Sequence, residues 1–572
     1  MKKAPKQSAT GRLQKAGTWT AVGSLLAAAG SLTAFSTAAG EEITRGSTTG
    51  QTGAKGYDHP NQYLHMPAVP IADNMEPVIP HPDQEKEARG KLAELEKRIG
   101  KKPNILVFIM DDVGWMDPGF NGGGESVGNP TPNMDRLAGR GLILTSAYST
   151  PSCTPTRATI HTGQNPLHHG LLRPPMYGEP GGLDGAITAP AILQKLGYVT
   201  QGVGKWHMGE NEGSLPQNVG YDDYYGFLGV SDMYTEWRDI YFNPEIALSP
   251  SRFEMMKKLP FNHNNIHCAK GKKGVENVYE INLTTISNLD QDWGNYSEKF
   301  IRDMAKSDKP WFLYHGTRAC HFDNYPDNEH AGISPARTVF SDALVEADAI
   351  LGKLVKALEE TGQLENTIIF FTSDNGPEGE IPPHGRSPFR GHKGSAWEGG
   401  VRVPTFVYWK GMIEPRRSDG LFDLGDLFNT CISLAGAPGA EVAKFLPADR
   451  YVDGIDQSSF LLADNGESCR RSRFYTLNQY LSGLRIDEFK YIITCELEDA
   501  IFPRGYKAGF SGAIITETGG GTMVNLYTDP QEDVSVGIRH LPAAMPFLAE
   551  FGRYQQVLKK YPMQVKVGFS GN

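Results

Sequence analysis

The sequence predicts an α/β protein: a large, mostly parallel β-sheet flanked by helices, followed by a smaller C-terminal subdomain with an antiparallel sheet. Between residues 101 and 465, short apolar runs alternate with segments of helical periodicity. Such alternation is typical of a parallel sheet covered by helices on both faces. The chain has six cysteines in 572 residues. This is too few for a disulfide framework, so a hydrophobic core must hold the fold together.

Residues 1–39 have the outline of a secretory signal peptide. Five basic residues precede the first acidic residue, Glu41, and an Ala/Gly/Leu-rich run from about Trp19 to Ala34 leads to small residues that end near Ala39. An uncleaved anchor is the alternative, because the run approaches the length of a membrane span. The pattern predicts a periplasmic or secreted protein with no stable membrane insertion after cleavage.

The charge balance argues against nucleic acid as a partner. Removal of the five basic residues would lower the formal net charge from −10 to −15. An acidic surface repels a polyanion, whereas a few cations gathered in a cleft can still bind a small anion.

Residues 40–100 are predicted to form an N-terminal linker and a helix. The helix is expected to begin at Asp83 as N-cap, and its charged residues are spaced for the surface pairs Glu85/Arg89 and Glu94/Arg98. Its apolar stripe consists of Ala88, Leu92, Leu95 and Ile99. This stripe predicts that the helix docks on the main domain, with dimer formation as the alternative.

The catalytic region, 101–465, contains six predicted strands: Asn104 to Met110, Leu142 to Tyr148, Tyr198 to Val203, Trp311 to Tyr314, Thr367 to Thr372 and Val403 to Trp409. Four predicted helices lie between them: Asn133 to Arg140, Ile187 to Leu196, Ser297 to Ala305 and Val339 to Thr361. The apolar helical pattern around Cys431 indicates a buried core thiol.

Residues 466–572 are predicted to form the C-terminal subdomain. Its short strands are expected at Phe474 to Leu477, Gly483 to Ile486, Lys490 to Thr494 and Val524 to Tyr527. A terminal helix is expected from about Ala543 to Lys560.

Polar motifs follow four of the predicted strands. They are Asp111-Asp112, Gly204-Lys205-Trp206-His207, His321 within a short loop, and Asp374-Asn375-Gly376. Taken singly, each also fits a helix cap, a turn or a core histidine. Because ligands bind at the carboxyl ends of parallel strands, the four together predict one shared site.

Adjacent aspartates after a buried strand indicate a bound cation, because like charges so close are costly without one. The predicted ligands are Asp111, Asp112, Asp374 and Asn375. Four oxygen ligands suit Ca²⁺, or Mg²⁺, better than Zn²⁺.

From Pro103 to about Pro530 the chain resembles the type I sulfatases of the alkaline phosphatase-like superfamily. The resemblance rests on N-I-L-V-F-I-M-D-D-V-G-W, T-P-N-M-D-R-L-A, C-T-P-T-R, G-K-W-H-M-G, P-Q-N-V-G-Y-D-D-Y-Y-G-F, S-D-N-G and F-R-G-H-K-G-S-A-W-E-G-G-V-R-V-P. It implies an alkaline phosphatase-like fold and a Cys153 oxidised to formylglycine by a maturation enzyme. It also places Cys153 beside the metal, within a sulfate-binding ring of Arg157, Lys205, His207, His321 and Lys393.

The implied activity is hydrolysis of a sulfate monoester to an alcohol or phenol plus inorganic sulfate. One hydroxyl of the hydrated aldehyde would attack sulfur, and the other would later expel sulfate. We expect His321 or Lys393 to donate the proton to the leaving alcohol and His207 to act as base for the second hydroxyl. Arg157 and Lys205 would orient the diol and neutralise charge.

Three questions stay open on the sequence alone. The motif around His321 is looser than the others, and His315 is its competitor. A phosphatase, or a phosphonate or phosphodiester hydrolase, is the alternative function, and an inactive binding protein a further one. The substrate, a sulfated small molecule or glycan, would be read by loops such as 232–274, where four aromatic residues either stack on it or pack the loop: Tyr234, Trp237, Tyr241 and Phe242.

Overall fold

The computed structural model describes residues 68–175, 179–496, 514–515, 521–538, 541–564 and 567. The predicted signal peptide and most of the predicted linker lie outside these residues. The predicted boundary near residue 465 stays a prediction, because residues on both sides of it belong to one compact unit, Pro60–Asn572.

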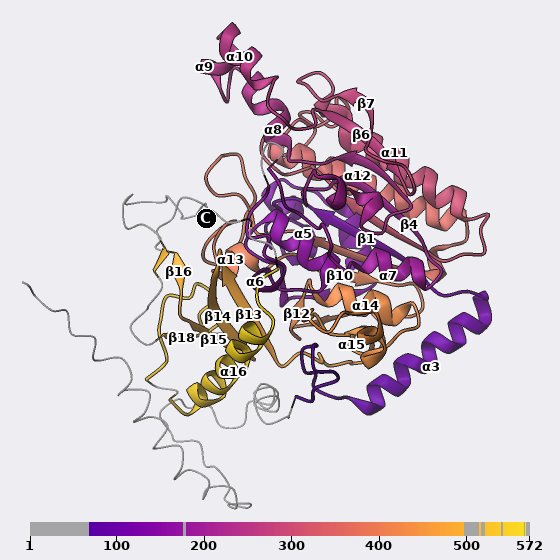
Figure 1. Cartoon of the computed structure of the whole chain (residues 1–572), viewed down its shortest axis with the longest axis vertical. Coiled ribbons are helices and arrows are strands. Elements are labelled where there is room, and N and C mark those ends of the chain that lie inside the picture. Colours follow the sequence, from indigo (N-terminus) through magenta and orange to yellow (C-terminus); the bar gives the residue numbers. More distant parts are fainter. Residues whose placement is uncertain are drawn as a thin grey trace, which may run out of the picture. The chain divides into compact units, whose positions relative to one another are not determined.

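A ten-stranded sheet forms the centre of this unit, with the strand order β11-β2-β10-β9-β1-β8-β4-β5-β6-β7 (Figure 1). Its five central strands are parallel: β9 (Thr367–Ser373), β1 (Asn104–Met110), β8 (Trp311–Gly316), β4 (Val199–Lys205) and β5 (Asp223–Phe227). Antiparallel pairs lie on both sides, through β10 (Thr405–Tyr408), β6 (Asn264–Ala269) and β7 (Glu276–Glu280). Next to β10 lies β2 (Leu142–Leu144), which pairs in parallel with the edge strand β11 (Arg416–Ser418).

The central strands of the sheet are buried on both faces, as predicted. On β1, Ile105, Val107 and Ile109 belong to one core cluster, whereas Leu106, Phe108 and Met110 belong to another. The first cluster includes residues of α5 (Cys153–Thr162), α7 (Ala189–Lys195) and α14 (Asp426–Leu434), and the second those of α4 (Pro132–Ala138), α11 (Leu289–Met304) and α12 (Val339–Glu360). This alternation confirms the predicted α/β class.

One strand prediction needs correction. The predicted strand from Leu142 to Tyr148 is two strands, because the chain leaves the large sheet after β2, and β3 (Ala147–Tyr148) pairs with β12 (Phe422–Asp423) in a sheet of its own. The Arg402 side chain stabilises the backbone between β2 and β3, because its Nε donates to the Thr145 carbonyl at 2.7 Å. The strand predicted from Val403 to Trp409 is β10, which runs antiparallel to its neighbours.

The N-terminal helix, α3 (Pro82–Ile99), docks as predicted through Ala88 and Leu95, which are buried in the first core cluster. It begins at Pro82 with His81 as N-cap rather than at Asp83, since proline suits the first turn of a helix. The Glu85/Arg89 pair forms, at 3.6 Å. Arg98 pairs with Glu365 at 2.8 Å rather than with Glu94, because docking brings Glu365 closer.

The helix predicted from Ser297 begins eight residues earlier, as α11 (Leu289–Met304). Leu289 and Trp293 extend the buried stripe of Ser297 and Ile301 by two turns. This earlier start places Asp290 in the first turn of the helix, beside the loop that follows β8.

The C-terminal region forms the predicted antiparallel sheet, with β13 (Ser472–Leu477), β14 (Tyr480–Ile486), β15 (Phe489–Ile492) and β18 (Thr522–Asn525). The terminal helix, α16 (Leu541–Lys560), packs on it through Phe547, Phe551 and Tyr554.

All six cysteines are free thiols, and Cys431 is buried in the core as predicted. None of the described helices combines the length and apolar character needed to cross a membrane.

Candidate active site

The four polar motifs meet at one edge of the sheet, where β1, β4, β8 and β9 end. Asp111 and Asp112 follow β1, Lys205 ends β4, and Asp374 follows β9. All four of these side chains are fully buried. His321 joins them from the loop after β8, and its Nε2 lies 3.9 Å from Asp112 Oδ2. The predicted shared site is therefore present in the structure.

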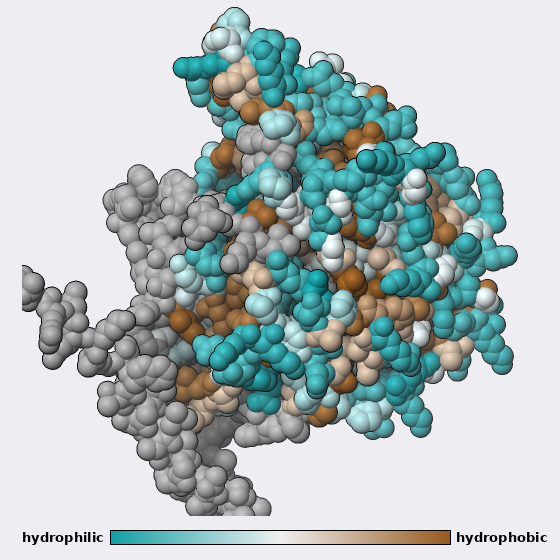
Figure 2. Space-filling view, in the orientation of Figure 1, coloured by the Kyte–Doolittle hydropathy of each residue, from teal (hydrophilic) through white to brown (hydrophobic). Residues whose placement is uncertain are grey.

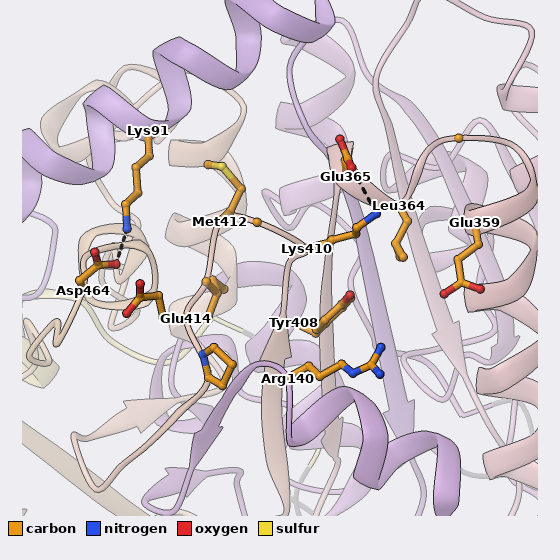
Figure 3. Close-up of a pocket in the computed structure, with 14 residues that line it drawn as sticks. Lys91, Arg140, Glu359, Leu364, Glu365, Tyr408, Lys410, Met412, Glu414 and Asp464 are labelled. Carbon is orange, nitrogen blue, oxygen red and sulfur yellow. Dashed lines mark hydrogen bonds and ion pairs between the residues drawn. The ribbon is translucent and has the colours of Figure 1, made fainter.

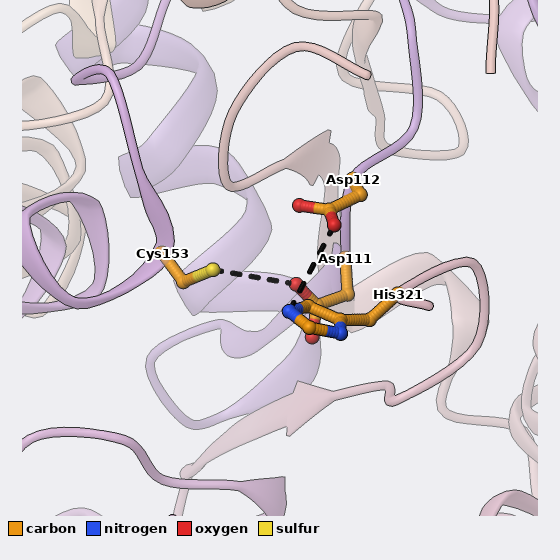
Figure 4. A group of neighbouring side chains, drawn as sticks. All are labelled: Asp111, Asp112, Cys153 and His321. Atoms are coloured by element: carbon orange, nitrogen blue, oxygen red, sulfur yellow. Dashed lines mark hydrogen bonds and ion pairs between the residues drawn. The ribbon is translucent and has the colours of Figure 1, made fainter. Parts of the chain in front are cut away.

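Cys153 is the first residue of α5, whose amino end points at this edge. Its Sγ lies 3.7 Å from Asp111 Oδ1 (Figure 4). Arg157 is one helical turn further on, so both side chains project from the same face of α5. The Arg157 guanidinium donates to Asp374 Oδ2 from Nε at 3.0 Å and from Nη2 at 2.8 Å. The four-residue spacing of Cys153 and Arg157 along the helix thus places their side chains side by side.

Each carboxylate of the site has a cationic partner. Lys205 Nζ donates to Asp111 Oδ2 at 2.5 Å, and Lys393 Nζ donates to Asp112 Oδ2 at 2.8 Å. Together with Arg157 on Asp374, these contacts balance three negative charges with three positive ones. A divalent cation and an anionic substrate carry opposite charges, so their joint binding would nearly preserve this charge balance. Charges that balance one another in this way can be buried together.

The pKa values of the two adjacent aspartates are shifted in opposite directions. Burial, together with the neighbouring carboxylates of Asp111 and Asp374, raises the pKa of Asp112 to about 7 in spite of Lys393. Burial alone would raise the pKa of Asp111 too, but Lys205, His321 and Arg157 outweigh it and lower that pKa below its usual range. The environment of Asp112 thus favours an additional positive charge.

The residues fit a hard cation. Asp111, Asp112, Cys153 and His321 each offer a ligand atom within 4.8 Å of one another (Figure 4). Asp374 Oδ1 adjoins them by accepting from Asp112 N at 3.3 Å, and Asn375 Nδ2 donates to Asp112 Oδ1 at 2.6 Å. Asn375 Oδ1 is buried and accepts no hydrogen bond from the described residues. An oxygen left without a donor beside three carboxylates is suited to a metal ligand.

The structure distinguishes the two candidate histidines. His321 Nε2 lies 3.1 Å from Lys393 Nζ, within the site. His315 is buried within β8, where its ring stacks on Phe108 at 4.9 Å and its Nδ1 bonds the Ser297 hydroxyl at 2.8 Å. Its geometry is that of a core histidine.

His207 is buried, and neither of its ring nitrogens has a hydrogen-bond partner in the described part of the chain. Burial and the neighbouring Lys205 lower the pKa of His207 well below its ordinary value, so the ring is neutral and can accept a hydrogen bond. Its backbone is in the left-handed region, with φ 59°, as is that of Asp112, with φ 57°. Strained residues of this kind concentrate at functional sites.

Sequence reasoning missed two supporting residues. Thr154 Oγ1 donates to the His207 carbonyl at 2.6 Å and so joins α5 to the loop after β4. At Gly316 an added Cβ would lie 2.8 Å from Arg157 Nη1, so this glycine makes room for the guanidinium. The available signal was the glycine that follows the predicted strand Trp311 to Tyr314 by two residues.

Of the four aromatic residues in the 232–274 segment, two pack the loop. Tyr234 and Trp237 are buried, whereas Tyr241 is 82% exposed. Tyr241 precedes α9 (Pro244–Ala247) and α10 (Pro250–Met256), which lie at the top of Figure 1. Figure 2 shows hydrophobic residues among hydrophilic ones in the same region.

A groove of about 1000 Å³ lies away from the site (Figure 3). Leu364 and Glu365, which line it, precede β9, whereas Asp374 follows that strand. The groove therefore lies toward the other end of β9. Two ion pairs lie along it, Lys410–Glu365 at 3.2 Å and Lys91–Asp464 at 2.5 Å.

A family model described as Sulfatase matches residues 103–437, which include every predicted site residue. The chain belongs to the sulfatase family. A second model, for the "sulfatase AslA C-terminal domain", matches residues 482–559. The sulfatase match confirms the resemblance noted in the sequence.

Relatives of this sulfatase include N-acetylgalactosamine-6-sulfatase of Canis lupus familiaris, 32% identical over 407 residues, or 68% of this chain and 71% of the relative. Arylsulfatase A of Homo sapiens is 32% identical over 384 residues, 66% and 71% of the two chains. The crystal structure of PsFucS1 sulfatase from Pseudoalteromonas sp. superposes with a TM-score of 0.82 at 40% identity, covering 87% of this chain and 99% of that one. The protein is a sulfuric ester hydrolase with an alkaline phosphatase-like fold.

Proposed function

We propose that this sulfatase acts through a formylglycine hydrate made from Cys153. The observation that carries the proposal is the position of Cys153, whose Sγ lies 3.7 Å from Asp111 Oδ1 at the amino end of a fully buried helix. Burial raises the pKa of the Cys153 thiol, so unmodified cysteine would be a weak nucleophile here. An aldehyde hydrate provides two hydroxyl groups at the same place.

In the first step, one hydroxyl of the hydrate gives its proton to a carboxylate beside it, such as Asp111, whose Oδ1 lies 3.7 Å from Cys153 Sγ. Its oxygen attacks sulfur, and the bond between sulfur and the ester oxygen breaks. The leaving oxygen takes a proton from Lys393 or His321, whose nitrogens lie 3.1 Å apart. Burial and Lys393 lower the pKa of His321 well below its ordinary value, whereas Asp112 holds the pKa of Lys393 well above its own in spite of burial. Lys393 thus carries the proton of this pair at neutral pH.

In the second step, the remaining hydroxyl loses its proton and becomes a carbonyl, and the carbon–oxygen bond to sulfate breaks. His207 is proposed as the base, because it is buried in the site and neither of its ring nitrogens has a hydrogen-bond partner among the described residues. Addition of water to the carbonyl restores the hydrate. Arg157 and Lys205 orient the diol and neutralise charge on the sulfuryl oxygens.

Asp111, Asp112, Asp374 and Asn375, with the oxygen that replaces the Cys153 thiol, would hold the metal. We propose Ca²⁺, with Mg²⁺ as the alternative, since these ligands offer only oxygen. A bound divalent cation supplies charge stabilisation at the sulfuryl group and lowers the pKa of the attacking hydroxyl.

We propose a sulfated glycan, or a sulfated small molecule, as substrate. N-acetylgalactosamine-6-sulfatase, among the relatives, is named for a sulfated sugar, which supports a glycan. Comparison of sulfated monosaccharides with aryl sulfates tests this proposal. An aryl sulfate and the matching aryl phosphate, assayed side by side, test the phosphatase alternative.

Maturation by a formylglycine-generating enzyme should be visible in the mass of one peptide. In active protein, the tryptic peptide that ends at Arg157 is expected to be lighter than its cysteine form, by the change from a CH₂SH group to a CHO group. A peptide that carries only thiol in fully active enzyme would contradict the proposed nucleophile. The same experiment on unmatured protein from a host without the maturation enzyme provides the control.

We also propose that the protein is exported to the periplasm or secreted. The support is the pattern of residues 1–39, five basic residues followed by an apolar run and small residues near Ala39. The amino-terminal sequence of protein recovered from the periplasm or medium is expected to begin close to residue 40. Recovery of an intact amino terminus from the membrane fraction would instead favour an anchor.

A further inference from the structure

The loop that carries His321 is organised around the buried guanidinium of Arg318. Nη1 of Arg318 donates to the Asp323 carbonyl at 3.4 Å, and Nη2 donates to the Tyr325 carbonyl at 2.9 Å. Arg318 precedes His321 in the chain, whereas both acceptors follow it. One side chain therefore ties the two arms of the loop together across His321.

Asp290, in the first turn of α11, holds the same arginine. Its Oδ1 accepts from the backbone N–H of Arg318 at 2.9 Å and from that of Ala319 at 3.4 Å. Its Oδ2 lies 3.1 Å from Arg318 Nη2, and both side chains are 1% exposed. The carboxylate thus fixes the backbone at the start of the loop as well as the guanidinium at its centre.

The loop needs such restraint because its backbone is strained beside His321. Cys320 has φ 82°, in the left-handed region that disfavours residues with a Cβ. Its N–H donates to Asn324 Oδ1 at 3.0 Å. Strained backbone persists only where the surrounding contacts over-determine it.

We infer that Asp290 and Arg318 form a positioning clamp that sets the distance between His321 and Lys393. This inference rests on the proposed function, in which His321 and Lys393 serve the leaving group. Their nitrogens are 3.1 Å apart, a separation that a relaxed loop would not preserve. Neither clamp residue touches the reacting atoms, so they act through His321.

A purely structural role is the competing explanation, and buried ion pairs often add little net stability. The contacts of Asp290 and Arg318 support a positioning role instead. All of them are made to residues 318–325, the loop that carries His321, or between the two side chains themselves. A clamp makes a specific prediction that a structural pair does not. Its loss should harm proton donation, and hence the hydrolysis of esters with poor leaving groups, more than it harms the other steps.

The test uses the full-length matured enzyme and two clamp variants, Asp290→Asn and Arg318→Lys. Asparagine cannot form the ion pair, and lysine lacks the planar fork that reaches two carbonyls and a carboxylate together. For each variant, kcat/KM is measured with para-nitrophenyl sulfate, whose leaving group needs little protonation, and with phenyl sulfate, whose leaving group needs more. The loss with phenyl sulfate is expected to exceed the loss with para-nitrophenyl sulfate by about tenfold.

Asp426→Asn is the matched control. Asp426 is also a buried carboxylate that accepts two backbone N–H groups, from Asp423 at 3.0 Å and Ile455 at 2.9 Å, and it binds Arg470. Its loss is expected to lower Tm without changing the ratio between the two substrates.

Equal losses on both substrates in the clamp variants, or the same change of ratio in Asp426→Asn, would overturn the clamp while leaving the sulfatase mechanism intact. If Asp290→Asn does not fold, Arg318→Lys decides alone, because it keeps the charge of the pair. A parent enzyme that hydrolyses neither of these esters nor any sulfated monosaccharide would instead overturn the proposed function, and the clamp with it.

Discussion

Removal of the divalent cation is expected to lower turnover by about a thousandfold. A bound cation contributes several kcal/mol of charge stabilisation in the transition state, and each 1.36 kcal/mol is a factor of about ten in rate. Without it, Lys205, Lys393 and Arg157 remain engaged with their carboxylates, and little positive charge is left for the sulfuryl group. Dialysis against a strong chelator, followed by an aryl sulfate assay, measures the effect.

Ca²⁺ or Mg²⁺ is expected to restore activity better than Zn²⁺. Binding should also raise Tm, because a ligand that binds only the folded state stabilises it. Asp374→Asn should lose this rise in Tm, whereas Asp426→Asn, a buried carboxylate outside the site, should keep it. Full activity in demonstrably metal-free protein would contradict the metal site.

The sequence predicted four of the five central strands, β9, β1, β8 and β4, because their signal is local. The continuous apolar run of β1 and the alternation with helices follow from burial on both faces of a parallel sheet. Strands β5, β6 and β7, which end the sheet on one side, were not predicted. On β7 the burial pattern is mostly exposed, so no apolar run marks it in the sequence.

The sequence predicted which residue types form the site and that they gather at one edge of the sheet, because each motif follows a strand. What sequence could not supply is the pairing within the site. That Lys205 contacts Asp111 while Lys393 contacts Asp112 depends on how β4 and the loop after β9 approach β1. The clamp on His321 was hidden for a similar reason, since Arg318 lies in the loop after β8 whereas Asp290 comes from α11, a separate element that follows no predicted strand end.

Substitutions of Cys153 distinguish the attack on sulfur from the later release of sulfate. Cys153→Ala is expected to lower kcat by at least about 10⁴-fold, the scale of loss when a covalent nucleophile is removed. Its Tm should change little, because alanine retains most of the packing of this small buried side chain. A matched test of folding is the Ca²⁺-dependent rise in Tm, which this variant should keep, since the oxygens of Asp111, Asp112, Asp374 and Asn375 remain.

Cys153→Ser is the sharper variant, because it keeps one hydroxyl near Asp111 and lacks the second. Serine can accept a sulfuryl group from an aryl sulfate once, with release of one equivalent of phenol. The sulfated serine has no second hydroxyl on the same carbon, so it cannot collapse to a carbonyl and expel sulfate. We therefore expect at most a stoichiometric burst, a sulfate adduct on the peptide that ends at Arg157, and a negligible steady-state rate. Sustained turnover near the parent rate would show that release does not require the carbonyl route, and would favour the phosphatase-like alternative.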